Sequence, residues 1–174
     1  MAVGTISSPA AWYNGTPAPA SWFQNAQDNV NAHAATQYIY LLPGSMSSIS
    51  GDWTVSHAGG ASQYVRMISS AASKDVMIDL SLPYRTSGTA GYKITDVSAV
   101  SVAGGGVNMT LKIWSTTIPS GISTQLGSTQ SGTGTLTQSS LSAIGTDGVQ
   151  LFALVTSGQA NDTLYGVKVT FVMV

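Results

Sequence analysis

Residues 74–82 read KDVMIDLSL, with an apolar side chain at every second position from Val76 to Leu82. Met77, Asp79 and Ser81 take the positions between, which is the period of a strand with one buried face. The same period returns at residues 107–113, VNMTLKI, directly after three glycines that can form a tight turn. The middle of the chain therefore predicts β-strands rather than helices.

Between these two stretches, residues 92–102 form a longer apolar alternation whose parity changes twice. The apolar residues at 92 and 94 share one parity, those at 97 and 99 take the other, and those at 100 and 102 return to the first. An extra residue in a strand shifts its parity in this way. We expect one long, bent strand with two β-bulges.

The rest of the chain from residue 36 onward consists of similar short apolar stretches separated by turn residues. The clearest lie at residues 38–42, 53–56, 64–68, 149–156 and 164–174. Residues 149–156 are apolar at both parities, which predicts a central strand covered on both faces, once by the core and once by something else such as another subunit. Residues 118–148 are rich in Ser, Thr and Gly, and their apolar residues suit short edge strands: Leu126, Leu136, Leu141 and Ile144.

About eight or more strands spaced roughly ten residues apart, with a helical pattern only near the N-terminus, are typical of a two-sheet β-sandwich. We predict an all-β fold, an antiparallel jelly-roll β-sandwich over residues 36–174. A Greek-key sandwich of the immunoglobulin type is the alternative. We expect the N-terminal residues 1–35 to form a separate arm with one short helix.

Composition narrows the classes of function. The chain has 174 residues, of which 43% are hydrophobic and 7% charged, with a net charge of −1 and no cysteine. One hydrophobic core should form, and the near-neutral surface argues against nucleic acid or an anionic membrane as a partner. No apolar run has the length of a membrane span or of a signal peptide. So little charge also means little repulsion between copies, which favours self-assembly.

The sequence does not predict an active site. His33 and His57 are the only histidines, and no metal ligands stand near either at a suitable spacing. Asp75 and Asp79 share a face of one predicted strand, but four residues of extended chain separate them by roughly 13 Å, too far for a glycosidase pair. We therefore expect no enzyme activity, no metal and no cofactor.

The arm contains three of the six prolines, which exclude a long helix or a central strand from its first half. Ser21 and Gln24 have the spacing of a capping box, which predicts a short helix up to about residue 35. Large aromatic side chains have little reason to lie on a solvated tail, so they either fold back on their own domain or anchor a neighbour. The docking candidates in the arm are Trp12, Tyr13, Trp22, Phe23 and Val30.

Two patterns resemble proteins of tailed bacteriophages. Residues 9–16, PAAWYNGT, and 22–31, WFQNAQDNVN, are similar to the N-terminal segment of phage structural proteins, in which a tryptophan and a glycine precede a closing Asp-Asn-x-Asn. The aromatic pair at 22–23 departs from the usual Leu or Met. The order of GDWT at 51–54, the strand at 77–83, ITDV at 94–97, LKIW at 111–114 and DTLYGV at 162–167 also resembles a β-sandwich domain of phage particles.

This resemblance implies a non-enzymatic structural component of a virion, located on the capsid as a decoration protein or associated with the head or tail. Such a protein acts through symmetric assembly, with a homo-oligomer, trimer favoured, and other virion proteins as partners.

The alternative is a carbohydrate- or receptor-binding module, such as a tail-fibre tip, with a host glycan as partner. Trp114 is its best candidate residue because it stands on the face opposite Met109, Leu111 and Ile113. Contact of Trp114 with the arm or a neighbouring subunit is the more ordinary role.

Overall fold

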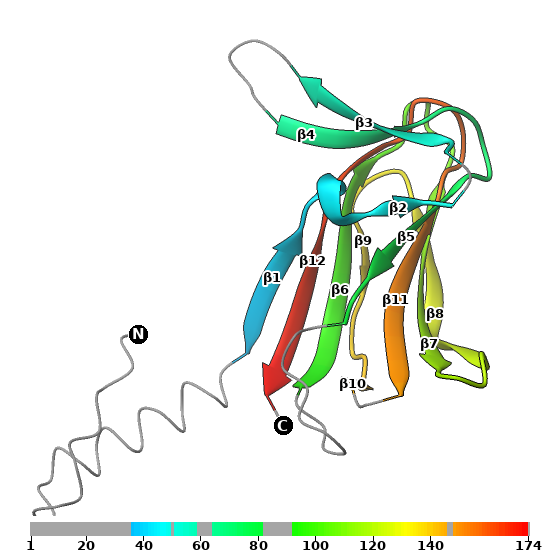
Figure 1. Cartoon of the computed structure of the whole chain (residues 1–174). Helices are drawn as coiled ribbons and strands as arrows, with labels where there is room; N and C mark the ends of the chain where they lie inside the picture. The colour runs from blue at the N-terminus through cyan, green and yellow to red at the C-terminus, as the bar shows by residue number, and fades with distance from the viewer. Residues whose placement is uncertain (1–35, 50, 59–63, 82–91, 146–147, 174) are drawn as a thin grey trace, which may run out of the picture.

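A computed structural model of the chain describes residues 36–49, 51–58, 64–81, 92–145 and 148–173. In this part of the chain two antiparallel sheets pack face to face (Figure 1). The predicted helix and the docking candidates Trp12, Tyr13, Trp22, Phe23 and Val30 lie outside the described residues. Among the described residues, no helix has the length and hydropathy of a transmembrane segment.

The larger sheet, sheet A, is built around β12, the C-terminal strand. β6 pairs with β12 along one side, and β1 and β4 share its other side, with β3 outside β4. Two short strands, β9 and β10, pair with the outer side of β6. The strands of sheet A are β1 (Gln37–Leu41), β3 (Trp53–Ala58), β4 (Tyr64–Ser69), β6 (Tyr92–Val102), β9 (Leu136–Gln138), β10 (Ala143–Gly145) and β12 (Thr163–Met173).

The smaller sheet, sheet B, has β11 at its centre, between β5 and β7. Its strands in spatial order are β2 (Ser47–Ser48), β5 (Asp75–Asp79), β11 (Val149–Thr156), β7 (Met109–Thr117) and β8 (Ser123–Gly132). The chain leaves β1 through a 3-10 turn, η2 (Pro43–Ser45), before it reaches β2. Pro43 has no backbone N–H, so it cannot continue the strand pairing. The predicted jelly-roll sandwich is confirmed.

The core lies between the sheets and follows directly from the alternation of side chains. Along β5 the burial alternates, with Val76 and Ile78 fully buried. Residues of the same parity on β7 and β11 meet them, and those of β6 and β12 face them from sheet A. The side chains with no exposed surface include Ile94, Val97, Leu111, Ile113, Val155, Leu164, Val167 and Val169.

β6 is a single eleven-residue strand, as predicted, but only one of its two expected bulges exists. The register with β12 shifts at Thr95, which accounts for the first change of parity. The predicted second change of parity is wrong, because Ser101 is buried, whereas Val102 is 51% exposed. Ser101 fits the core because its Oγ donates to the carbonyl of Gly134 at 2.9 Å, and the second register shift lies on β12 at Tyr165.

The region 118–148 is more regular than its composition predicts. Leu136 and Leu141 are buried in short segments, as expected, but β8 is a ten-residue strand. Ile144 is 43% exposed and the neighbouring Ala143 takes the core position.

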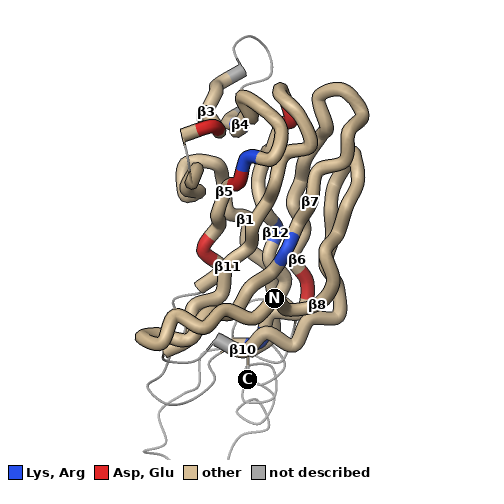
Figure 2. Tube along the Cα trace, turned by 90° about the vertical axis from the view of Figure 1, so that its right-hand side faces the viewer, with Lys and Arg blue, Asp and Glu red and all other residues tan. Residues whose placement is uncertain are grey.

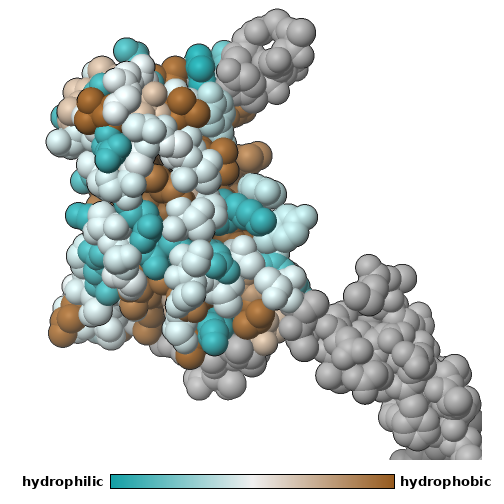
Figure 3. Space-filling view, turned by 180° about the vertical axis from the view of Figure 1, so that it is seen from behind, coloured by the Kyte–Doolittle hydropathy of each residue, from teal (hydrophilic) through white to brown (hydrophobic). Residues whose placement is uncertain are grey.

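The surface is weakly charged, as the composition implies. Figure 2 shows the few charged residues scattered along the strands, with long stretches between them. Seen from behind, the molecule presents a mostly pale and teal surface, with its apolar patches toward the two ends (Figure 3). Polar but uncharged side chains therefore cover much of this face.

Candidate functional site

The outer face of sheet B carries large apolar side chains at its centre. Leu151, Ala153 and Val155 of β11 point into the core, so Phe152 and Leu154 point outward, where both are half-buried. Trp114 on β7 lies directly opposite Phe152, and Met77 on β5 lies directly opposite Leu154. We call Met77, Trp114, Phe152 and Leu154 the platform.

The register makes these residues neighbours. Side chains directly opposite each other on adjacent antiparallel strands have Cβ atoms about 4.5–5.5 Å apart, so cross-strand partners are in contact range. Phe152 stands between Trp114 and Asp79, and Leu154 stands between Lys112 and Met77. The platform is thus a continuous apolar strip that crosses three strands.

Polar side chains surround this strip. Gln125 on β8 is the partner of Trp114, and Gln150 on β11 is the partner of Thr116. At the other end, the Oγ1 of Thr156 donates to Oδ1 of Asp75 at 2.6 Å. We call this ring the rim; its members are Asp75, Asp79, Thr110, Lys112, Thr116, Gln125, Gln150 and Thr156.

One donor in the platform has no partner. The Nε1 of Trp114 is buried and makes no hydrogen bond in the described part of the chain. A buried donor without an acceptor costs about 1–3 kcal/mol, and most such groups in proteins are paired. The structure therefore holds at this position a polar group whose hydrogen-bonding capacity is unused.

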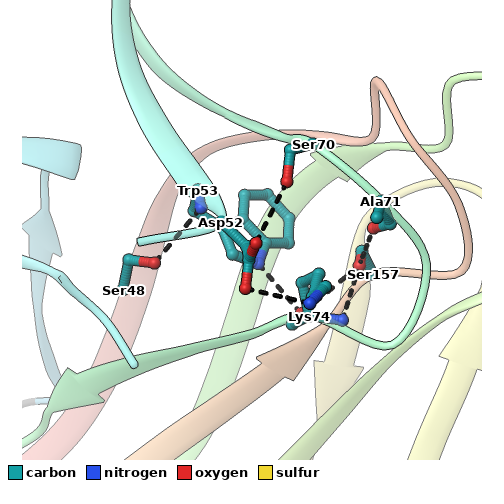
Figure 4. Close-up of polar contacts among 7 residues, drawn as sticks. All are labelled: Ser48, Asp52, Trp53, Ser70, Ala71, Lys74 and Ser157. Carbon is teal, nitrogen blue, oxygen red and sulfur yellow. Dashed lines mark hydrogen bonds and ion pairs between the residues drawn. The ribbon is translucent and has the colours of Figure 1, made fainter. Parts of the chain in front are cut away.

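A hydrogen-bonded cluster holds one end of the platform (Figure 4). The Nε1 of Trp53 donates to the carbonyl of Lys74 at 2.9 Å, and Nζ of Lys74 lies 3.0 Å from Oδ2 of Asp52. The backbone N–H of Lys74 donates to Oγ of Ser157 at 2.9 Å, and that hydroxyl donates to the carbonyl of Ala71 at 2.7 Å. The start of β5 and the end of β11, with Asp75 and Thr156, are therefore fixed relative to each other.

Asp162 fixes the loops at the same end of the sandwich. Its side chain is fully buried and accepts three backbone N–H groups, from Gly104 at 2.8 Å, Gly158 at 2.7 Å and Gln159 at 3.1 Å. A Cβ on Gly104 would lie 2.6 Å from the carbonyl oxygen of Asn161, so only glycine lets the two loops approach this closely. This carboxylate has a structural role, and the sequence did not single it out.

Trp114 is the one predicted docking or binding residue within the described part. It lies on the face opposite the core, as expected, but it is half-buried, and Tyr38 and Tyr40 are the more exposed aromatics at 61% and 58%. Phe152, Leu154 and Met77 were not identified as site residues. The signal for Phe152 and Leu154 was the double apolar parity of β11.

The acidic residues that the structure describes do not gather into a metal-binding group. Among the residues described, no cluster of three or more His, Asp or Glu could hold a metal ion. Asp75 and Asp79 lie on the same face of β5, with Met77 between them. His57 is on β3 in sheet A, whereas the platform belongs to sheet B. His33 lies outside the described residues.

Neither a family model nor a curated protein matches this chain. Among solved structures, the CBM22-1 xylan-binding domain of Xyn10C from Paenibacillus barcinonensis is similar, with a TM-score of 0.51 and 11% identity over 80% of this chain and 96% of that domain. CsCBM6-3 from Clostridium stercorarium, solved in complex with cellobiose, gives a TM-score of 0.45 and 16% identity over 79% of this chain and 92% of that one. A family 6 carbohydrate-binding module gives 0.46 and 19%, with the same two coverages. The first likeness shows a shared sandwich fold and nothing more, and the two with TM-scores below 0.5 add nothing to it.

Proposed function

We propose that this chain is a non-catalytic, glycan-binding β-sandwich whose binding site is the outer face of sheet B. The observation that carries the proposal is the placement of Trp114 and Phe152 as direct cross-strand partners at the centre of a polar rim. Sugar rings present C–H faces that pack on aromatic side chains, and their hydroxyl groups pair with carboxylates, amides and ammonium groups. The platform and its rim offer both kinds of contact on one surface.

The charges of the rim favour a neutral glycan. Asp75 and Asp79 carry negative charge and Lys112 carries positive charge, so the rim has a net charge of about −1 when all three are ionised. An acidic sugar would meet two carboxylates and one ammonium group, which is unfavourable on balance. The hydroxyl groups of a neutral glycan can accept hydrogen bonds from Lys112 and Gln125 and donate hydrogen bonds to Asp75 and Asp79.

One similar fold has a known glycan partner, which supports this choice. A xylan-binding domain shares the sandwich architecture at a TM-score of 0.51, so the architecture is one that carries glycan sites. Function depends on the site rather than on the fold, however, and the identity between the two chains is 11%. The residues of the platform, not the likeness, are the basis of the proposal.

A glycan array with the purified chain, Trp114→Ala and Phe152→Ala tests the proposal. Each substitution should abolish binding to the glycans that the unaltered chain retains, because truncation removes the aromatic contact at the centre of the site. Val102→Ala is the control, since Val102 is an exposed apolar residue on sheet A. Equal binding by all four proteins would exclude the platform as the site.

We propose as a separate matter that the module is part of a virion, as a structural component fastened by residues 1–35. The support is the resemblance of residues 9–31 to phage structural proteins, and these residues lie outside the described part. A chain that begins at Thr36 should keep the circular-dichroism spectrum of a β-sheet protein and should melt cooperatively, but it should no longer attach to particles. Combined replacement of Trp12 and Trp22 by Ala should weaken attachment in the full chain; unchanged attachment of both variants would show that the arm is not the anchor.

A further inference from the structure

The edge strands of the two sheets differ in how they are protected against pairing with another chain. An open edge exposes unpaired backbone N–H and C=O groups, and proteins protect such edges by shortness, charge, proline or bulges. β2 has two residues, and β9 and β10 have three each. β8 contains the positive-φ Gly127 (φ 71°), a register shift against β7 and mainly polar side chains. β3 has none of these features: it is six residues long, its register with β4 is unbroken, and Thr54, Ser56 and His57 are its polar residues.

β1 likewise has none of these protections, and unlike β3 it carries two exposed tyrosines, Tyr38 and Tyr40. It runs QYIYL from Gln37 to Leu41, without charge, proline or glycine, and its register with β12 is unbroken over all five residues. It lies at the border of the sandwich in Figure 1, and no described strand pairs with its other edge. Over residues 38–41, β1 is therefore a regular, uncharged edge with no neighbouring strand on that side in the described part of the chain.

Both faces of β1 are suited to extend the sandwich. Ile39 and Leu41 pack against the core. Tyr38 and Tyr40 point outward with their ring centroids 5.8 Å apart in an edge-to-face arrangement. Nζ of Lys168 lies 4.7 Å from the centroid of Tyr38 and belongs to β12, on the paired side of β1. The outer face of β1 thus presents two tyrosine rings, and β1 itself contains no charged residue.

We infer that β1 is the contact surface for a second copy of this chain, through antiparallel pairing of the two β1 strands about a two-fold axis at Ile39. This register places Tyr38 opposite Tyr40 of the partner subunit, and Ile39 opposite its own counterpart. The Tyr38–Tyr40 pairs on the outer face and the Ile39 pair on the inner face are among the favourable cross-strand combinations, and Gln37 stands opposite Leu41 of the partner subunit. The strand is self-complementary, as a two-fold interface requires.

The position of the arm supports the same partner. Residues 1–35 end directly before β1, and antiparallel pairing brings Thr36 of one copy beside Leu42 of the partner subunit. Leu42 is 62% exposed. The 35-residue segment that contains Trp12, Tyr13, Trp22 and Phe23 directly precedes this contact in the sequence, so its aromatic residues are available to add to a short strand-to-strand contact. With a net charge of −1, the two copies repel each other weakly.

Substitution at the two exposed tyrosines tests this pairing in the full chain. In the variant Tyr38→Lys with Tyr40→Lys, the antiparallel register brings four ammonium groups together, and we expect the dissociation constant of the pair to rise by about tenfold or more. Val55→Lys is the matched control, because it places a lysine at an exposed apolar position on the edge strand β3. Sedimentation velocity over a concentration series measures the effect.

A mixing experiment tests the register itself. A second variant, Tyr38→Asp with Tyr40→Asp, should also fail to pair with itself, yet it should form mixed pairs with the lysine variant, because each lysine then faces an aspartate. Restored pairing in the mixture, with a normal melting temperature for each variant alone, is the expected result. A monomer at all concentrations for the unaltered chain, or an oligomer such as the trimer favoured by the sequence that both variants leave intact, would overturn the inference. Glycan binding is measured separately through Trp114, so failure of one proposal leaves the other standing.

Discussion

The outer faces of the two sheets differ although their inner faces are alike. On sheet A, polar side chains stand at outward positions of the two central strands: Ser98 on β6, whose hydroxyl oxygen lies 2.9 Å from that of Thr137 on the edge strand β9, and Lys168 on β12, the other partner of Ser98. On sheet B, the corresponding central positions hold Trp114 and Phe152. Both sheets use one parity of each strand for the core, so the other parity is free to vary. A contiguous group of large apolar side chains on an outward face is the kind of surface that proteins use to bind a partner.

The largest effect should come from Asp162, which joins the loop after β6 to the loop between β11 and β12. Asp162→Ala would remove the shared acceptor of three partly buried backbone N–H groups, and hydrogen bonds to a charged group contribute about 1.5–3 kcal/mol each, so we expect the free energy of unfolding to fall by at least about 3 kcal/mol. Urea denaturation measures this change. Asp79→Ala is the control, because Asp79 is exposed and accepts one hydrogen bond, from the N–H of Ser81 at 2.8 Å. Equal losses for the two variants would show that the buried carboxylate does not join the loops.

The next effect separates the two faces of a single strand. Leu151→Ala removes a side chain that is 1% exposed, and we expect it to lower the free energy of unfolding by about 2–5 kcal/mol. Leu154→Ala removes the same atoms from the half-buried platform of the same strand, and we expect less than about half of that loss. Paired denaturation curves give the difference. A greater loss at Leu154 would mean that the outer face of sheet B is itself a core.

A smaller effect should appear at the rim. Thr156→Val keeps the shape of the side chain but removes the hydrogen bond to Asp75, so the free energy of unfolding should fall by about 1 kcal/mol. Thr170→Val is the matched control on the outer face of sheet A, where the same substitution should leave thermal stability nearly unchanged. If both variants melt alike, the hydrogen bond to Asp75 does not order the end of the platform.

The sequence predicted strands where alternation is strong, and failed where hydrogen bonds replace apolar burial. β5, β7, β11 and β12 follow their apolar period. β8 does not, because its side chains are mostly Ser, Thr, Gln and Gly, and it is held by backbone pairing with β7 and by Gln130, whose Nε2 donates to Oε1 of Gln138 at 2.9 Å. The prediction of a second bulge in β6 failed for the same reason, because the hydrogen-bonded hydroxyl of Ser101 occupies a core position.

The candidate site was predicted in part. Alternation alone places Trp114 on an outward face, and the double parity of residues 149–156 shows that their second face is also apolar. That Trp114 meets Phe152 depends on the register between two strands far apart in the chain, and single-sequence periodicity does not contain that register. The hydrogen bonds of Asp52, Lys74 and Ser157 are likewise a product of tertiary structure.

The most direct test of the glycan site is calorimetric titration of a soluble oligosaccharide, chosen from the array, into three proteins: the unaltered chain, Trp114→Ala and Tyr40→Ala. Both substitutions truncate an outward aromatic side chain, one on each sheet. We predict that Trp114→Ala weakens binding by at least about 2 kcal/mol, as for a central aromatic anchor, while Tyr40→Ala binds like the unaltered chain. Normal affinity in Trp114→Ala, or a loss confined to Tyr40→Ala, would contradict the assignment of the site to sheet B.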